Sequence, residues 1–212
     1  MDIKRRLLLI VCALASAGFS ARGQVVGVKT NLLDDVFANI NIGLEAGVAP
    51  RWTVEVPVSL NYWIFKDDAW VFRRDGRWKH YALQPGVRYW FCSRFSGHFL
   101  GAHLHGGQYN VGGFKSGLRL PGWNGDGKYV GTDFSNLDDT RLQGWFVGGG
   151  ISYGYAFILG RHWNLELELG VGYSYTRYDQ FRCTGCGKKV AEDVPHHYAG
   201  PTKAAINLVY LF

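Results

Sequence analysis

The feature of this sequence that most restricts its fold is a strict alternation of large apolar residues with polar or small ones. In residues 163–175, WNLELELGVGYSY, the odd positions are Trp, Leu, Val or Tyr and the even positions are Asn, Glu, Gly or Ser. Successive side chains of a β-strand point to opposite faces, so this stretch predicts a strand with one apolar and one polar face. Glu166 and Glu168 share the polar face.

The same alternation recurs in eight runs, and helical periodicity is nowhere convincing. The runs cover residues 25–33, 39–48, 52–64, 79–91, 98–109, 143–157, 163–179 and 198–212. Three short turns, APR, CSRFSG and LGRH, alternate with longer connections, a pattern typical of membrane barrels. We therefore expect an all-β fold, an eight-stranded antiparallel up-and-down transmembrane β-barrel. Pro57 and Pro85 lie inside predicted strands, where we expect a bulge or a different register.

Alternation alone does not distinguish a membrane barrel from a soluble one, because the two differ in which face is apolar. Residue size indicates the orientation. The polar face of run 143–157 carries Gly148, Gly150, Ser152 and Gly154, and an eight-stranded barrel has little room inside. We expect these residues inside and the apolar face against lipid. A soluble β-sandwich is the alternative.

The aromatic residues give a second indication, because Trp and Tyr collect where lipid meets water. One group follows the short turns and the C-terminus, and the other lies near the long loops. We expect an aromatic girdle formed by Trp52, Phe91, Phe157, Trp163 and Phe212 at one rim and by Tyr173 and Tyr175 at the other.

The start of the chain predicts export. Basic residues at 4–6 precede an apolar run from 7 to about 19 and then small residues, the pattern of a signal peptide cleaved before Gln24. Residues 1–23 are then the signal peptide and residues 24–212 one barrel domain, with an uncleaved signal anchor as the alternative. Removal of four cations and one carboxylate lowers the formal charge from +6 to +3, so we expect no nucleic-acid partner.

The last run ends the chain on AAINLVYLF, with Ile206, Leu208, Tyr210 and Phe212 on one face. An alternating final strand that closes on an aromatic residue resembles the signal read by the outer-membrane assembly machinery. Together with the export signal, it predicts a location in the cell outer membrane. Outer-membrane lipid and the assembly machinery are then partners.

The phase of the alternation also predicts which charged groups point into the barrel. Buried charges must be paired, because an unpaired charge in a low-dielectric interior is strongly unfavourable. We expect a salt-bridge network that fills the lumen as a plug, with a narrow ion or proton path as the alternative. Its members are Lys29, Glu45, Glu55, Arg88, His103, His105, Glu166, Glu168 and Lys203, with Gln84 and Asn207 among them.

The mature chain keeps three cysteines. Cys183 and Cys186 form a CxxC in the last long loop, ahead of His196 and His197, whereas Cys92 is expected at the opposite rim. A disulfide is common in exported loops, two thiolates with two imidazoles would complete a zinc site, and free or redox-active thiols are the third option. Apart from this zinc option, we expect no cofactor.

We find no catalytic signature. A lipid A-modifying hydrolase needs a serine, a histidine and a carboxylate within hydrogen-bond reach, and no serine adjoins His103 or His105 on their strand face. The stretches GVGYSY and GGGISYG are not nucleophile elbows, because no helix follows them. We expect that the protein is not an enzyme.

Two long loops, at residues 67–79 and 118–139, mix aromatic and charged groups. Loops on a rigid scaffold commonly carry recognition. Solvated connections without a partner are the alternative. The binding candidates in these loops are Trp70, Arg73, Arg74, Trp78 and Trp123.

Six segments carry a family resemblance: VKTNLL (28–33), HYALQPGVRYWF (80–91), GQYNVGG (107–113), WNLELELGVGYSYTRYD (163–179), CTGCGKK (183–189) and HYAGPTKAAINLVYLF (197–212). They resemble an uncharacterised family of small outer-membrane barrels from Bacteroidetes, a domain of unknown function. CxxCG and HYxGPTK are the most specific elements, and the resemblance covers nearly the whole mature chain. It implies an eight-stranded barrel and no catalytic residues. Genes of this family often lie near fimbrial components, which implies surface assembly as the setting.

We therefore expect a structural or binding role at the cell surface that supports fimbrial or envelope assembly through the extracellular loops. Fimbrial or other surface proteins are the partners that this role implies. A narrow pore for small solutes or ions is the alternative, and a lipid A-modifying enzyme is the third hypothesis.

Overall fold

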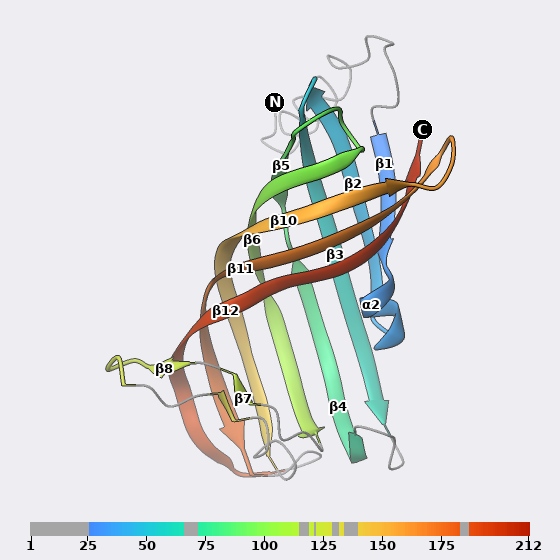
Figure 1. Cartoon of the computed structure of the whole chain (residues 1–212). Helices are drawn as coiled ribbons and strands as arrows, with labels where there is room; N and C mark the ends of the chain where they lie inside the picture. Colours follow the sequence, from blue (N-terminus) through green and yellow to red (C-terminus); the bar gives the residue numbers. More distant parts are fainter. Residues whose placement is uncertain are drawn as a thin grey trace, which may run out of the picture.

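The computed structural model describes residues 26–65, 72–114, 119–120, 122–128, 132–133, 140–182 and 187–212. The predicted signal peptide lies outside these residues. The elements, all but β9 labelled in Figure 1, are β1 (Val26–Asn31), α2 (Leu32–Val36), β2 (Ile40–Ala49), β3 (Trp52–Phe65), β4 (Phe72–Leu83), β5 (Gly86–Trp90), β6 (Gly97–Phe114), β7 (Arg119–Leu120), β8 (Trp123–Asn124), β9 (Thr132–Asp133), β10 (Arg141–Ile158), β11 (Trp163–Phe181) and β12 (Lys189–Leu211).

Eight antiparallel wall strands close into a barrel. Their order is β1, β2, β3, β4 with β5, β6, β10, β11 and β12, and β12 pairs back onto β1. Each strand lies beside its neighbour in the sequence, so the predicted all-β, eight-stranded antiparallel up-and-down barrel is confirmed. Among the described residues, no helix is long and apolar enough to cross a membrane.

For two strands, the start predicted from the sequence is too late. The structure starts β4 at residue 72 rather than 79 and β12 at residue 189 rather than 198. The added segments, FRRDGRW and KVAEDVPHH, are rich in charged residues. Because of these charges, no apolar alternation can be recognised in the two segments. In the structure they are strands nevertheless, because they pair with β6 and β11.

Pro57 and Pro85 lie where the ladder beside β3 is interrupted. Strand β3 pairs with β4 as far as Leu83 and with β5 from Gly86 onward, at the same offset. The expected bulge or change of register is therefore wrong. Proline lacks only the donor, and the Gln84 N–H still donates to the Pro57 carbonyl at 3.0 Å.

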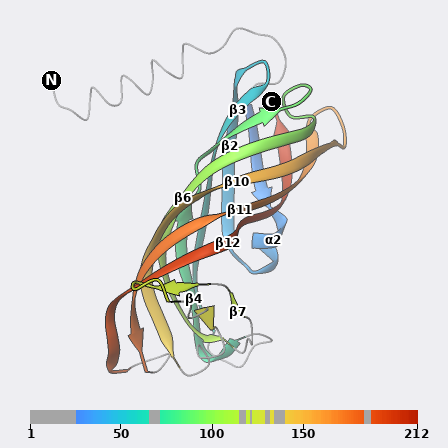
Figure 2. The ribbon, with the colours of Figure 1, turned by 60° about the vertical axis from the view of Figure 1, so that its left-hand side comes forward.

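The two ends of the barrel differ. The turn rim holds the connections at residues 50–51, 91–96 and 159–162, together with Val26 and Phe212, whose backbones are hydrogen bonded at 3.0 Å. The loop rim is the opposite end, where β3, β4, β6, β10, β11 and β12 meet the longer connections. Strands β6, β10, β11 and β12 are long and bend along their length, whereas β1 is short and continues into α2 (Figure 1). In Figure 2, α2 lies beside β12.

The distribution of side chains is the reverse of that in a soluble globular domain. Leucine, isoleucine, valine and aromatic side chains cover the outer face, and carboxylates, amides, lysines and an arginine are buried inside. The buried apolar cluster is small and lies at the turn rim, where it closes that end of the lumen. It comprises Trp90, Phe95, Phe99, Ala156, Val209 and Leu211.

Glycines on the inner face allow the wall to bend. A Cβ added to Gly107 would lie 2.0 Å from the Tyr81 carbonyl oxygen, and one added to Gly144 would lie 2.2 Å from the Arg177 carbonyl oxygen. Both contacts are to backbone, which cannot rotate away as a side chain can. These positions therefore admit only glycine without a shift of the neighbouring strand.

We predict that Gly107→Ala and Gly144→Ala each lower the free energy of unfolding by about 1–3 kcal/mol, because the added methyl group overpacks the wall. Gly160→Ala is the control: no atom lies within 4 Å of its Cβ position, so its effect stays within about 0.5 kcal/mol. Urea titrations followed by tryptophan fluorescence measure the difference. Equal stability of all three variants would contradict this account of the bend.

Candidate functional site

Seven charged side chains from six strands meet inside the barrel. The alternation along each strand turns them inward, and each is at most 8% exposed. We call this group the lumenal ion cluster. Its members are Lys29 on β1, Glu45 on β2, Glu55 on β3, Arg88 on β5, Glu166 and Glu168 on β11, and Lys203 on β12.

Arg88 is the centre of the cluster, because its guanidinium contacts all four carboxylates. Nη1 lies 2.9 Å from Glu45 and 2.8 Å from Glu166, and Nη2 lies 2.9 Å from Glu55 and also pairs with Glu168. The planar guanidinium presents its donors in a fixed fork, which suits it to bridge several carboxylates. Arg88 therefore ties β5 to β2, β3 and β11 across the lumen.

The two lysines complete the cluster from β1 and β12. Lys29 pairs with Glu45 at 2.8 Å and with Glu55, and Lys203 pairs with Glu168 at 2.9 Å and with Glu55. Four carboxylates thus face three permanent cations. Hydroxyls supply further donors, as when Ser152 Oγ donates to Glu168 at 2.6 Å. Nearly every charge is held by an opposite charge from another strand.

A polar cavity of about 270 Å³ lies on the loop-rim side of the cluster. Lys29, Glu55 and Lys203 form part of its lining, and Gln84 reaches across the lumen and donates to the Thr202 carbonyl at 3.2 Å. The remaining predicted lumen residues in its lining are His105 and Asn207.

The two predicted histidines lie beside the ion cluster rather than within it. His103 contacts the Thr202 hydroxyl at 3.1 Å through Nε2, and its ring centroid lies 5.8 Å from that of His105. The Nδ1 atoms of both rings are buried and have no hydrogen-bond partner among the described residues. No ion pair joins either ring to a cluster carboxylate in the part of the chain that the structure describes.

The sequence reasoning missed a contact between a serine and a histidine. Ser59 Oγ lies 3.3 Å from His80 Nε2, and both residues line the polar cavity. Asp34 also lines this cavity, but its carboxylate accepts hydrogen bonds from the amides of Asn31 and Asn39. The three groups therefore do not form the relay of a serine hydrolase. Inward positions compared across neighbouring runs, rather than within one, would have found the pair.

The histidines of the predicted zinc site are separated by the wall. His196 and His197 follow each other in β12, so one is buried inside and the other faces outward between Tyr173 and Tyr175, with ring centroids 6.0 and 5.1 Å away. Consecutive strand residues point to opposite faces, so these imidazoles do not converge on one ion. Cys183 and Cys186 lie outside the described residues, whereas Cys92 is exposed at the turn rim.

Of the predicted loop candidates, the structure describes the side chains of Trp78 and Trp123. Trp70 lies outside the described residues, and Arg73 and Arg74 belong to β4, where their side chains are not described. Trp78 was wrongly placed in a loop: it lies in β4, and its Nε1 donates to Asn39 Oδ1 at 3.0 Å. Trp123 is in β8, which pairs with β12 and so attaches part of the longest connection to the wall.

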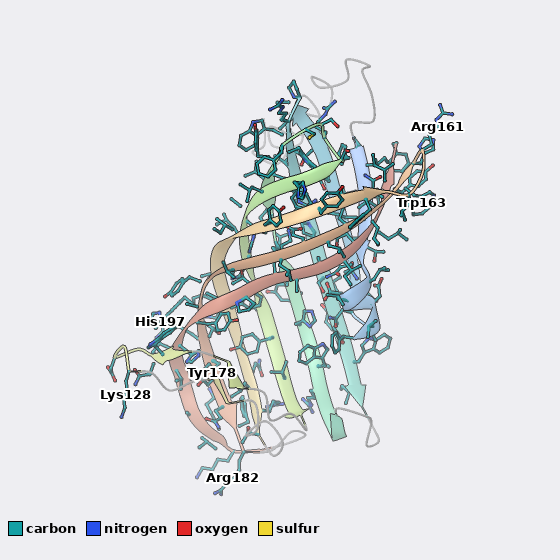
Figure 3. All side chains as sticks on the ribbon, viewed as in Figure 1. Lys128, Arg161, Trp163, Tyr178, Arg182 and His197 are labelled. Carbon is teal, nitrogen blue, oxygen red and sulfur yellow. The ribbon has the colours of Figure 1, made fainter. Side chains whose placement is uncertain are left out.

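The predicted girdle residues occupy the outer face at two levels. Figure 3 labels Trp163 near the turn rim, together with Arg161 of the adjacent turn. Tyr173 and Tyr175 follow on the same face of β11, toward the loop rim. The residues near the turn rim are Trp52, Phe91, Phe157, Trp163 and Phe212, all of which are exposed.

The loop rim carries surface ion pairs between β11 and β12. Arg177 pairs with Asp193 at 2.6 Å, and Lys189 lies 2.9 Å from both Asp179 and Glu192. The backbone N–H of Asp193 and the ammonium of Lys189 hold the pKa of the Asp179 carboxyl below its usual range. These pairs tie the ends of the longest hairpin together.

We predict that Arg88→Met lowers the free energy of unfolding by about 3–5 kcal/mol, because it leaves four buried carboxylates with only two cations. Lys128→Met, a change of the same type at an exposed turn, shifts it by no more than about 0.5 kcal/mol. Urea titration measures both. If Arg88→Met unfolded at the wild-type urea concentration, the cluster would not hold the barrel together.

Two comparisons with known proteins bear on this barrel. Residues 7–212 match the model of a family described as "Protein of unknown function (DUF3575)". The comparison with curated proteins gave no match.

Proposed function

The chain belongs to the DUF3575 family, and we propose that it is an outer-membrane β-barrel protein with a structural or binding role at the cell surface. One observation carries the proposal: the barrel buries its charges and exposes its hydrocarbon. Leu104, Ile151 and Leu169 are 65–73% exposed, whereas every member of the lumenal ion cluster is at most 8% exposed. Water is a poor solvent for such a surface, and lipid is a good one.

The height of the apolar band fits a bilayer. On β10 the outward positions from Phe157 to Val147 are apolar apart from Gly149, and polar residues begin at Gln143. Ten steps along a strand cover about 34 Å, which a tilt of about 40° reduces to about 26 Å along the membrane normal. This height matches the apolar band of known membrane barrels, which is about 25 Å tall.

The lumen supports a structural role. Arg88 crosses it to reach carboxylates on three other strands, and the lysines fill the remaining space beside Glu45, Glu55 and Glu168. A bundle of paired charges at this position blocks a small barrel, in which side chains already fill most of the interior. We therefore favour an anchor over a pore. A steady conductance of the purified protein in planar bilayers would favour the pore.

The loop rim is the surface through which an anchored barrel acts. Short turns face the periplasm in barrels of this type and long connections face outward, so the loop rim is extracellular in this orientation. Part of the longest connection is attached to β12 through Trp123 and Asn124. The family resemblance points to fimbrial or envelope assembly as the process that this rim supports.

We predict that Ile151→Arg lowers the free energy of unfolding in lipid vesicles by about 2–4 kcal/mol, because it places a charge near the middle of the apolar band. Gln143→Arg is the matched control on the same strand face and lowers it by no more than about 1 kcal/mol, because it lies at the rim. Urea unfolding of vesicle-inserted protein measures both. Equal losses, or a wild-type chain that is a monodisperse monomer in water without detergent, would contradict membrane insertion.

We predict that replacing residues 118–139 by a short Gly-Ser linker leaves the barrel folded, because β6 and β10 pair outside this segment. The variant loses the surface proteins that co-purify with the cross-linked wild type, whereas Arg161→Ala at the turn rim retains them. Quantitative mass spectrometry of the co-purified proteins measures the loss. An unchanged set of partners would contradict recognition through this connection.

The enzyme hypothesis has a separate test. An altered mass spectrum of lipid A in a strain that lacks the gene would favour an enzyme.

A further inference from the structure

A groove of about 390 Å³ crosses the outer face of the wall at the loop rim. It is lined by consecutive residues of β4, β6, β10 and β11, every second of which points outward, and by Tyr62 of β3 and Asp193 of β12. Figure 3 marks this level of β11 with Tyr178, well separated from Trp163 at the turn rim. We call it the rim groove, and the residues that matter for its chemistry are Lys79, Tyr81, Asn110, Gln143, Trp145 and Arg177.

The strand register arranges the groove in two rows. In the row nearer the loop rim, Lys79 is paired with Asn110, Asn110 with Gln143, and Gln143 with Asp179. Side chains paired in this way lie about 5 Å apart. This row is polar along its whole length.

The second row lies one step nearer the turn rim and carries the rings. It runs from Tyr81 through Gln108 to Trp145 and Arg177. The next outward positions toward the turn rim are apolar, as at Leu83 and Val147. The groove therefore straddles the level at which the outer face changes from apolar to polar.

The charges in the groove leave one cation uncommitted. Arg177 is paired with Asp193, and Asp179 with Lys189. Among the described residues, the ammonium of Lys79 has no hydrogen-bond or ion-pair partner, although Lys79 lines the groove.

The groove also holds two amides, of which one is accessible. Asn110 Nδ2 donates to Gln143 Oε1 at 3.4 Å, a long hydrogen bond, and Asn110 Oδ1 is buried without a partner among the described residues, whereas the Gln143 side chain is exposed. The groove thus offers aromatic rings, an exposed amide and a free ammonium side by side.

We propose that the rim groove binds the phosphorylated saccharide head group of an outer-leaflet lipid. Trp145 and Tyr81 present rings to the apolar face of a sugar, and they lie where aromatic residues meet the membrane interface. The exposed Gln143 amide donates to and accepts from hydroxyl groups, and Lys79 takes the phosphate as a point charge. This inference rests on the proposed membrane location, which sets the groove at the height of the head groups.

A lipid fits the groove better than free phosphate does. Free phosphate would meet only Lys79 as an uncommitted cation, and a single exposed ion pair strengthens binding by about fivefold or less. A lipid whose chains lie along Leu83 and Val147 adds apolar contact below the sugar. The same lipid is concentrated in the plane of the membrane, so weak polar contacts suffice to retain it.

The test uses the full mature barrel, refolded in detergent and titrated with a purified deep-rough lipopolysaccharide that carries its lipid A phosphates. Native mass spectrometry counts the bound molecules. Lys79→Gln and Trp145→Leu are each expected to weaken binding about fivefold, the loss expected for one exposed charge pair or one ring contact. Lys128→Gln, at the turn after β8, and Trp163→Leu, at the turn rim, are the matched controls and are expected to bind like the wild type.

Further probes identify the source of the phosphate. Dephosphorylated lipopolysaccharide is expected to bind about as weakly as the full lipid binds to Lys79→Gln. Inorganic phosphate and phosphatidylglycerol at the same concentration are expected not to compete. Competition by inorganic phosphate alone would overturn the choice of a lipid, and competition by phosphatidylglycerol would overturn the role of the sugar.

The outcomes separate this inference from the proposed function. If the groove variants bind like the wild type while all proteins insert into vesicles, only the rim groove assignment is wrong. Equal weakening by the controls would likewise overturn it. If the wild-type chain fails to insert into vesicles, the proposed membrane location is wrong, and the groove loses its ligand with it.

Discussion

The barrel depends on the pairing of Arg88 with four carboxylates inside the lumen. These groups come from strands far apart in the sequence, and each is unfavourable in the interior without the others. The pairing therefore selects one register for the whole wall. A slip of one residue in β11 would turn Glu166 and Glu168 to the outer face and bring leucines into the lumen, because side chains alternate along a strand.

The same constraint explains the unusual composition of each face. Charges inside require small neighbours, and the inner face supplies them at Gly43, where a Cβ would lie 2.9 Å from Lys29 Cγ, and at Gly101, where it would lie 3.5 Å from Glu168 Oε1. The outer face then carries almost all of the large apolar side chains. The inversion that holds the fold together is therefore also the observation on which the proposed membrane location rests.

The alternation of apolar and polar residues in the sequence predicts which side chains face the lumen. It does not predict which of these side chains contact one another. The phase of a single run was enough to place Lys29, Arg88 and Lys203 inside, because inward and outward positions alternate without exception over most of each strand. Partners across the lumen depend on the register between strands, which no single run contains, so Ser59 and His80 were not connected. The charged ends of β4 and β12 hide the alternation, which is why Trp78 was assigned to a loop and the last strand was expected to begin only at residue 198.

The lumenal ion cluster, which stabilises the barrel, and the rim groove, which we propose binds a lipid, lie at different levels of the same strands. On β11, the cluster residue Glu168 lies near the turn rim, and Asp179, which lines the rim groove, lies eleven residues further along, a distance of about 36 Å in an extended strand. The ion cluster and the apolar cluster around Trp90 fix the half of the barrel near the turn rim. The loop rim, which is held by exposed ion pairs such as that of Arg177 with Asp193, can therefore change its residues without disturbing the charges that keep the barrel closed.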